Sequence, residues 1–164
     1  MRPVTESDIR ASFVNCTKGE AKRMAVPKDL AERPWDDLDF LGWRDPAAPE
    51  RAYMVLESGE GLTGVALRLA VPNAGHFRKS MCSLCLTTHT GGGVSLMTAR
   101  RAGRNGQDGN TVGAYFCADL ACSLYLRGKK RAGLGGRMHE SLSLEELIAR
   151  TEVNLAEFVG RVVG

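Results

Sequence analysis

Cys82-Ser-Leu-Cys85 and Cys117-Ala-Asp-Leu-Ala-Cys122 are the stretches that decide the fold, and thirty-one residues separate them. A two-residue turn directs the thiolates of Cys82 and Cys85 at one point, as a tetrahedral ion with ligands at about 2.3 Å requires. Cys117 ends an apolar, strand-like run. Cys122 falls in the first turn of a helical stretch, where the helix N-terminus favours a thiolate. Four cysteines spaced in this way predict one zinc site.

The expected order of elements is the treble-clef arrangement of a zinc finger. It has a knuckle at the first pair of cysteines, then a hairpin, then a helix that begins at the second pair. The alternatives are two unrelated pairs of buried thiols or a redox Cys-x-x-Cys motif, which usually opens a helix in a βαβ unit. His76 or His89 would replace a cysteine ligand only if Cys122 pointed away. Cys16 has no second ligand nearby and is expected to be a small buried hydrophobe.

Length and composition fit a single zinc-binding domain over residues 1–164, since 43% apolar and 25% charged residues are ordinary for a globular protein. The sequence contains no apolar run of eighteen residues, and its first ten residues lack a signal-peptide core. Five cysteines, four of them at metal-ligand spacing, fit a reducing compartment better than a disulfide framework. We therefore expect a cytoplasmic protein.

Basic residues concentrate in the zinc half. Between residues 78 and 137, ten basic residues face two acidic ones, a net charge of +8, which leaves −5 for the rest of a chain whose total is +3. Such a cationic module suits RNA, a ribosomal neighbourhood or an acidic protein surface. Phe116 and Tyr125 either add aromatic anchors or belong to the core. The predicted partner-binding residues are Arg100, Arg101, Arg104, Arg127, Lys129, Lys130 and Arg131.

The flanking segments predict an α+β fold with a mostly antiparallel sheet. Residues 1–27 hold two short lead-in helices, near 6–15 and 17–24, which begin with capping patterns at Thr5 and Thr17. Proline punctuates residues 30–49, which we expect to be loop-rich, with one helical turn near Trp35 and with Trp35 and Trp43 filling a core.

Residues 51–127 are expected to hold the sheet and the zinc site. Alternating apolar residues predict a hairpin and a second pair of strands, at 51–57, 62–71, 94–101 and 111–116. The loop 103–109 between the last two strands is too rich in glycine to hold a fixed shape unaided. Ser143 opens a capping box for a C-terminal helix over 143–162, whose apolar stripe runs from Leu144 to Val162.

No stretch of the sequence predicts an enzyme. A catalytic zinc keeps one position open for water, and four thiolates leave none. The sequence has no Gly-x-Ser-x-Gly elbow, His-Glu-x-x-His motif, dinucleotide fingerprint or phosphate-binding glycine loop. Neighbouring carboxylates such as Asp36 and Asp37 point apart on a helix. We expect a binding function, with neither a small-molecule substrate nor a membrane as partner.

Three segments resemble the treble-clef zinc-finger domain of the elongation factor G-binding, FusB-type fusidic acid resistance proteins. They are Cys82-Ser-Leu-Cys85, Val94-Ser-Leu-Met-Thr-Ala-Arg-Arg101 and Asn110-Thr-Val-Gly-Ala-Tyr-Phe-Cys-Ala-Asp-Leu-Ala-Cys-Ser-Leu-Tyr-Leu-Arg-Gly128. The resemblance extends to Thr5–Pro27, although two short helices stand where the resistance proteins have a helical-bundle domain.

This resemblance implies a cytoplasmic protein that holds Zn2+ through the four cysteines and binds elongation factor G. In the resistance proteins, such binding promotes release of the factor from ribosomes stalled by the drug. The alternative is a zinc module that binds the ribosome or RNA through the same basic residues.

Overall fold

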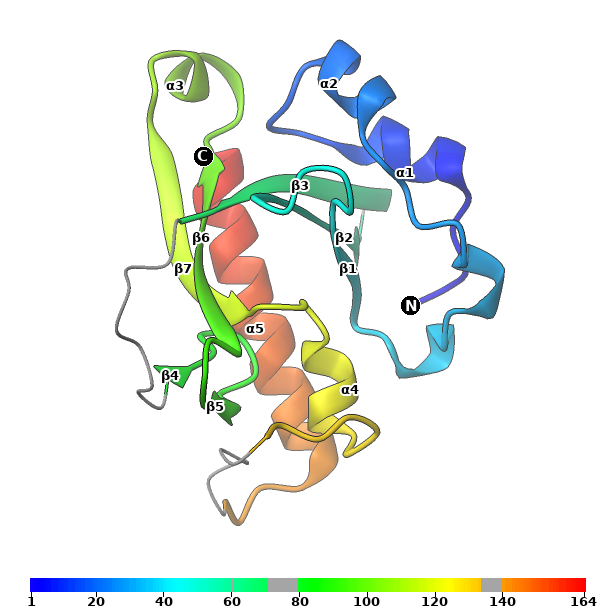
Figure 1. Cartoon of the computed structure of the whole chain (residues 1–164), viewed down its shortest axis with the longest axis vertical. Coiled ribbons are helices and arrows are strands. Elements are labelled where there is room, and N and C mark those ends of the chain that lie inside the picture. The colour runs from blue at the N-terminus through cyan, green and yellow to red at the C-terminus, as the bar shows by residue number, and fades with distance from the viewer. Residues whose placement is uncertain (60, 71–79, 134–139) are drawn as a thin grey trace.

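A five-stranded antiparallel sheet forms the centre of the computed structural model, which describes residues 1–59, 61–70, 80–133 and 140–164 (Figure 1). Its strand order is β1-β2-β3-β6-β7, and β4 and β5 form a separate two-stranded sheet. The strands are β1 (Phe40–Arg44), β2 (Arg51–Ser58), β3 (Gly61–Leu69), β4 (Ser80–Met81), β5 (Thr88–His89), β6 (Val94–Arg100) and β7 (Thr111–Cys117). The predicted α+β class with an antiparallel sheet is confirmed.

Five α-helices and two 3-10 turns surround this sheet in the described part of the chain. They are α1 (Glu6–Ser12), α2 (Lys18–Arg23), η1 (Leu30–Glu32), η2 (Trp35–Asp37), α3 (Gly103–Gln107), α4 (Cys122–Leu126) and α5 (Leu144–Val163). Among the described residues, no helix combines the length and the apolar character that a membrane span needs.

The three helices with predicted capping signals begin where the sequence places them. Thr5, Thr17 and Ser143 each accept a hydrogen bond from the backbone three residues on, and an acidic side chain there accepts one from the cap backbone. Both lead-in helices end earlier than predicted. After α1 the chain becomes extended, because Phe13 bridges Gly64 of β3 and the Val14 amide donates to the Gly64 carbonyl.

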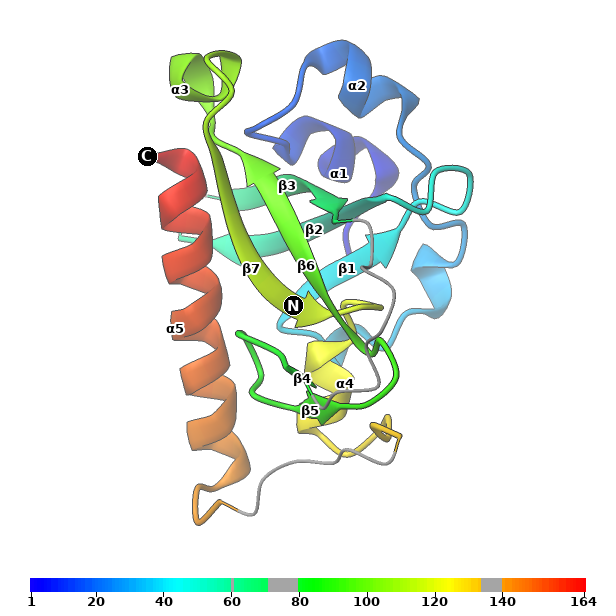
Figure 2. The same ribbon diagram turned by 60° about the vertical axis from the view of Figure 1, so that its left-hand side comes forward.

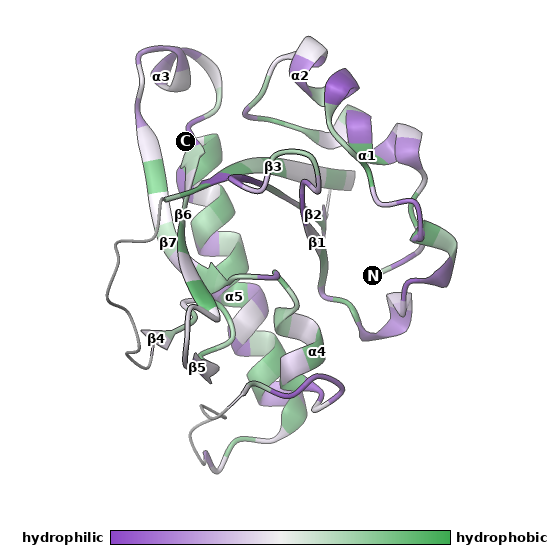
Figure 3. Ribbon diagram, in the orientation of Figure 1, coloured by the Kyte–Doolittle hydropathy of each residue, from purple (hydrophilic) through white to green (hydrophobic). Residues whose placement is uncertain are grey.

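The sheet is covered on both faces, which explains the apolar character of β2. Ala52, Met54 and Leu56 join the core beneath α5, whereas Tyr53 and Val55 face the second core with the N-terminal segment. Figure 2 shows α5 along one side of the sheet and α1 and α2 on the other. In Figure 3, α1 and α2 are mostly hydrophilic, whereas hydrophobic and hydrophilic residues alternate along α5.

Two predictions for the irregular segments need correction. Residues 30–49 contain strand β1, although Trp35 and Trp43 do fill the second core, as predicted. The glycine-rich segment 103–109 contains helix α3. A Cβ on Gly106 would lie 1.8 Å from the Arg101 carbonyl oxygen, so glycine lets the turn fold tightly against the strand end. The Arg101 amide donates to the Asn110 carbonyl and closes this turn.

A single side chain completes the middle of the sheet. Strands β3 and β6 pair directly only at Arg68 with Thr98 and at Leu69 with Met97. Two residues further along that register, at Ala66 and Arg100, the buried Asn15 amide lies between the strands. Its Nδ2 donates to the carbonyls of Ala66 and Arg100, at 2.9 and 3.0 Å, and its Oδ1 accepts from the Ala66 amide at 2.8 Å.

Asn15→Ala is expected to lower the free energy of unfolding by about 2 kcal/mol, because three partly buried backbone groups lose their hydrogen-bond partner. Urea denaturation of both proteins measures the loss. Asn105→Ala, at an exposed position of α3, is the matched control and should change the stability little. Equal stabilities of the Asn15 and Asn105 variants would contradict the bridging role.

Candidate metal centre

The four predicted ligands converge in one buried cluster. The Sγ atoms of Cys82, Cys85, Cys117 and Cys122 all lie within 4.8 Å of one another. The Sγ atoms of Cys82 and Cys122 are 3.7 Å apart, and those of Cys85 and Cys117 are 3.6 Å apart. A tetrahedral site with Zn–S bonds of about 2.3 Å requires sulfur atoms about 3.8 Å apart. The donor set and its spacing therefore fit a zinc ion.

The first pair of cysteines sits on a tight knuckle between β4 and β5. Leu86 adopts a left-handed conformation, with φ of 55°, and its amide donates to the Cys82 carbonyl. The Leu84 amide points at the Cys82 sulfur, 3.4 Å away, and the Thr87 hydroxyl lies 3.3 Å from the Cys85 sulfur. The Leu84 amide stabilises negative charge on the Cys82 sulfur, and the hydrogen bond with Thr87 helps to lower the pKa of Cys85.

The second pair is placed by the end of β7 and the start of α4. Cys117 ends the strand and Cys122 begins the helix, as predicted. Between them, Leu120 turns the chain with φ of 55° and packs on Gly42 of β1. A Cβ on Gly42 would lie 2.5 Å from the Leu120 Cβ, so this glycine permits the close approach.

The four cysteines interact through hydrogen bonds between their sulfur atoms. Those from Cys117 and Cys122 lower the pKa of Cys85, while hydrogen bonds to Cys117 and Cys82 raise the pKa of Cys122. Burial also opposes ionisation, so the cluster cannot hold four thiolates unaided. A divalent cation would supply the missing positive charge.

His89 supports the cluster and is not one of the four ligands. Cys122 points inward, and the His89 Nε2 lies within hydrogen-bond distance of the Cys117 sulfur, at 3.3 Å. The ring of His89 packs edge-on against Tyr125, whose hydroxyl donates to Asp119 at 2.8 Å. Cys16 lies outside the cluster and is half-buried. His76 lies outside the described residues.

A hydrogen bond and shared core packing connect the C-terminal helix α5 to the knuckle. The Asn154 Nδ2 donates to the carbonyl of Leu84, between the first two cysteines, at 2.9 Å. Leu84, Leu155 and Phe158 are buried in the same core, and Phe158 packs edge-on against Phe116 of β7. The predicted apolar stripe of α5 is thus largely buried, although Leu144 remains 46% exposed.

The seven predicted partner-binding residues lie in two groups. Arg100, Arg101 and Arg104 lie at the β6 end and α3, whereas Arg127, Lys129, Lys130 and Arg131 follow α4. Figure 1 shows α3 at the top of the molecule and α4 in its lower half.

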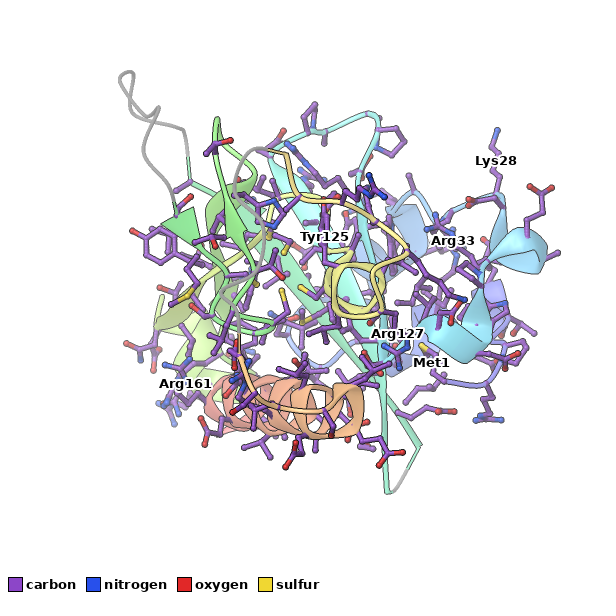
Figure 4. All side chains as sticks on the ribbon, turned by 90° about the horizontal axis from the view of Figure 1, so that it is seen from below. Met1, Lys28, Arg33, Tyr125, Arg127 and Arg161 are labelled. Atoms are coloured by element: carbon purple, nitrogen blue, oxygen red, sulfur yellow. The ribbon has the colours of Figure 1, made fainter. Side chains whose placement is uncertain are left out.

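Ion pairs engage four of these seven side chains. Arg127 forms a two-pronged pair with Asp39 at 2.7 and 2.8 Å, and only 14% of its side chain is exposed. It lies beside α4 and α5 (Figure 4). Lys129, Lys130 and Arg100 pair at the surface with Asp37, Asp119 and Glu20. Arg101, Arg104 and Arg131 have no ion pair among the described residues.

Two exposed apolar side chains beside the zinc site were missed from the sequence. Tyr115 of β7 is 52% exposed, and Met81 of β4 is 46% exposed. The chain just after β4 contacts β7, where the Ser83 amide donates to the Tyr115 carbonyl. Phe116, which sequence reasoning left open as an anchor, is fully buried in the core. Alternation along β7 was the available signal, because Val112 and Phe116 facing the core turn Tyr115 outward.

Fold and cysteine cluster together define a zinc-finger protein of the treble-clef class. A family model, the FBP C-terminal treble-clef zinc-finger, matches residues 8–162, and the chain belongs to this family. The search of curated proteins and the search of solved structures each gave no match.

Cys117→Ser is expected to abolish stoichiometric zinc and to unfold the half of the molecule around β4, β5, β7 and α4. Metal binding supplies on the order of 10 kcal/mol of folding free energy in small zinc modules. Metal analysis together with circular dichroism tests this. Cys16→Ser, outside the cluster, should keep the zinc. A folded, zinc-loaded Cys117→Ser protein would refute the site.

Arg127→Gln is expected to lower the free energy of unfolding by about 2 to 4 kcal/mol, because it leaves the buried Asp39 carboxylate unpaired. Lys129→Gln removes the same charge from an exposed pair and should cost less than about 1 kcal/mol. Denaturant titration of both variants measures the difference. A loss no larger for Arg127 than for Lys129 would contradict a structural role for Arg127.

Proposed function

We propose that this protein binds translation elongation factor G, with the zinc site serving to rigidify the docking surface. Membership of the FBP C-terminal treble-clef zinc-finger family carries the proposal, together with the resemblance of the cysteine segments to the factor-binding FusB-type proteins. Modulation of the factor's release from the ribosome, and a place in the cytoplasm, belong to the same proposal. The protein's role in it is binding, without catalysis.

The surface beside the zinc site offers the chemistry that such docking needs. Tyr115 and Met81 supply exposed apolar area, and Tyr is a common anchor at protein interfaces. Lys129 and Lys130 form exposed pairs, and Arg131 adds a third cation next to them. Exposed pairs contribute little stability, so an acidic partner can compete for these lysines. Arg127 is largely buried in its pair with Asp39, so the proposed docking surface does not include it.

Titration calorimetry of the zinc-loaded protein against elongation factor G, with RNA removed and at two salt concentrations, tests the proposal. We expect saturable binding that weakens with salt, because charge complementarity across an interface is screened by ions. Absence of binding at both salt concentrations would refute it.

Variants distinguish the two basic groups. Tyr115→Ala and Arg131→Gln are expected to weaken binding, whereas Arg104→Gln in α3 should leave it unchanged. Weaker binding by Arg104→Gln alone, with Tyr115→Ala and Arg131→Gln unaffected, would indicate that the docking surface lies at α3. A pull-down repeated after nuclease treatment separates the alternative function, since a complex that is lost with the RNA indicates a ribosome- or RNA-binding module.

A further inference from the structure

A pocket of about 270 Å³ lies on the sheet face that α2 only partly covers, away from the zinc site. Strands β2, β3, β6 and β7 form its floor, and the end of α2 forms one wall. Four arginines line it: Arg23 of α2, Arg51 of β2, Arg68 of β3 and Arg100 of β6. Tyr53, Thr98 and Thr111 add hydroxyl groups to the lining.

Two of these arginines lie directly opposite each other on adjacent strands. Arg51 and Arg68 are direct register partners in the antiparallel pair of β2 and β3. Like charges directly opposite on neighbouring strands destabilise a sheet. An anion between them would convert this repulsion into attraction.

Acidic side chains near the pocket pair with two of its four arginines, Arg100 and Arg51. Glu20 pairs with Arg100 at 2.7 Å, and it also accepts from the Thr17 amide at the start of α2. Glu50 lies 3.7 Å from Arg51 in a loose, exposed pair. Asp45, behind the pocket, accepts from Tyr53 and from two backbone amides.

Arg23 and Arg68 have no ion pair among the described residues. Outside those residues the sequence has one acid, at position 60, between the ends of β2 and β3 farthest from Arg51 and Arg68. The carbonyls at the end of α2, which would repel an anion, are covered by Arg10, whose Nη1 donates to those of Ala21, Lys22 and Met24.

We propose that this pocket binds the phosphate group of a small molecule. Arginines from four elements, α2, β2, β3 and β6, line this one pocket. Several guanidinium groups suit the three or more acceptor oxygens of a tetrahedral phosphate better than a planar carboxylate. The volume exceeds that of one phosphate and is close to that of the smaller ligand pockets, so a diphosphate or a phosphate ester fits.

Titration calorimetry at low ionic strength, with inorganic phosphate, pyrophosphate and adenosine monophosphate as probes, tests this proposal. We expect saturable binding of at least one probe. Arg68→Gln should weaken it by at least about tenfold through the loss of a charge-assisted hydrogen bond. Arg104→Gln removes the same charge from an exposed position outside the pocket and should bind as the parent does. The preferred probe distinguishes a free phosphate from a phosphate ester.

Thermal unfolding gives a second readout for the same variants. Without a probe, Arg68→Gln should be at least as stable as the parent protein, because the cross-strand repulsion is relieved. The rise in Tm that pyrophosphate causes in the parent should disappear in Arg68→Gln and persist in Arg104→Gln. Arg51→Gln repeats the test if Arg68→Gln fails to fold.

Four outcomes would overturn the proposal. In calorimetry they are the absence of saturation with any probe, and equal binding by the Arg68 and Arg104 variants. The others are a Tm rise that sodium chloride reproduces at equal ionic strength, and tighter binding of citrate or of a short RNA than of every phosphate probe. None of these measurements involves elongation factor G, so the two proposals succeed or fail independently.

Discussion

Convergence of four thiolates on one point is the constraint on which the zinc half depends. It ties the knuckle at Cys82 and Cys85 to the end of β7 and the start of α4, which are more than thirty residues further along the chain. The Asn154 side chain then fastens α5 to the knuckle, and Leu120 packs against β1. Short elements such as β4, β5 and α4 bury too little area to be stable alone, so their order follows from the metal site.

Local signals accounted for much of the architecture. Capping boxes at Thr17 and Ser143 set the helix starts, and cysteine spacing identified the cluster before any contact was known. Strand β1 escaped prediction because prolines surround it and because its pairing with β2 is non-local. The helical turn of α3 also escaped, since the close packing of Gly106 on Arg101 is a tertiary contact that glycine content does not reveal.

The distribution of charge in the sequence predicted the partner-binding residues less well than the cysteine spacing predicted the metal site. The sequence divides into a cationic zinc half and an acidic remainder, yet the structure places several of those acids on the very cations that composition suggested for a partner. Asp39 forms an ion pair with Arg127, Asp37 with Lys129 and Glu20 with Arg100. Net charge counts residues and cannot tell which are already paired, so it overestimates the free positive surface. It also missed Arg51 and Arg68, which lie outside the basic stretch but meet in the fold.

The bridging amide of Asn15 has a consequence for the order in which the chain assembles. Its acceptors lie fifty-one and eighty-five residues downstream, at Ala66 and Arg100. A nascent chain emerges from its N-terminus, so Asn15 and the β1–β3 meander can meet while β6 is still being synthesised. Strand β6 therefore pairs with β3 late, after the Asn15 side chain has already bound to the edge of β3. Until then, the edge of β3 is occupied in part by a side chain, which protects it from pairing with another strand.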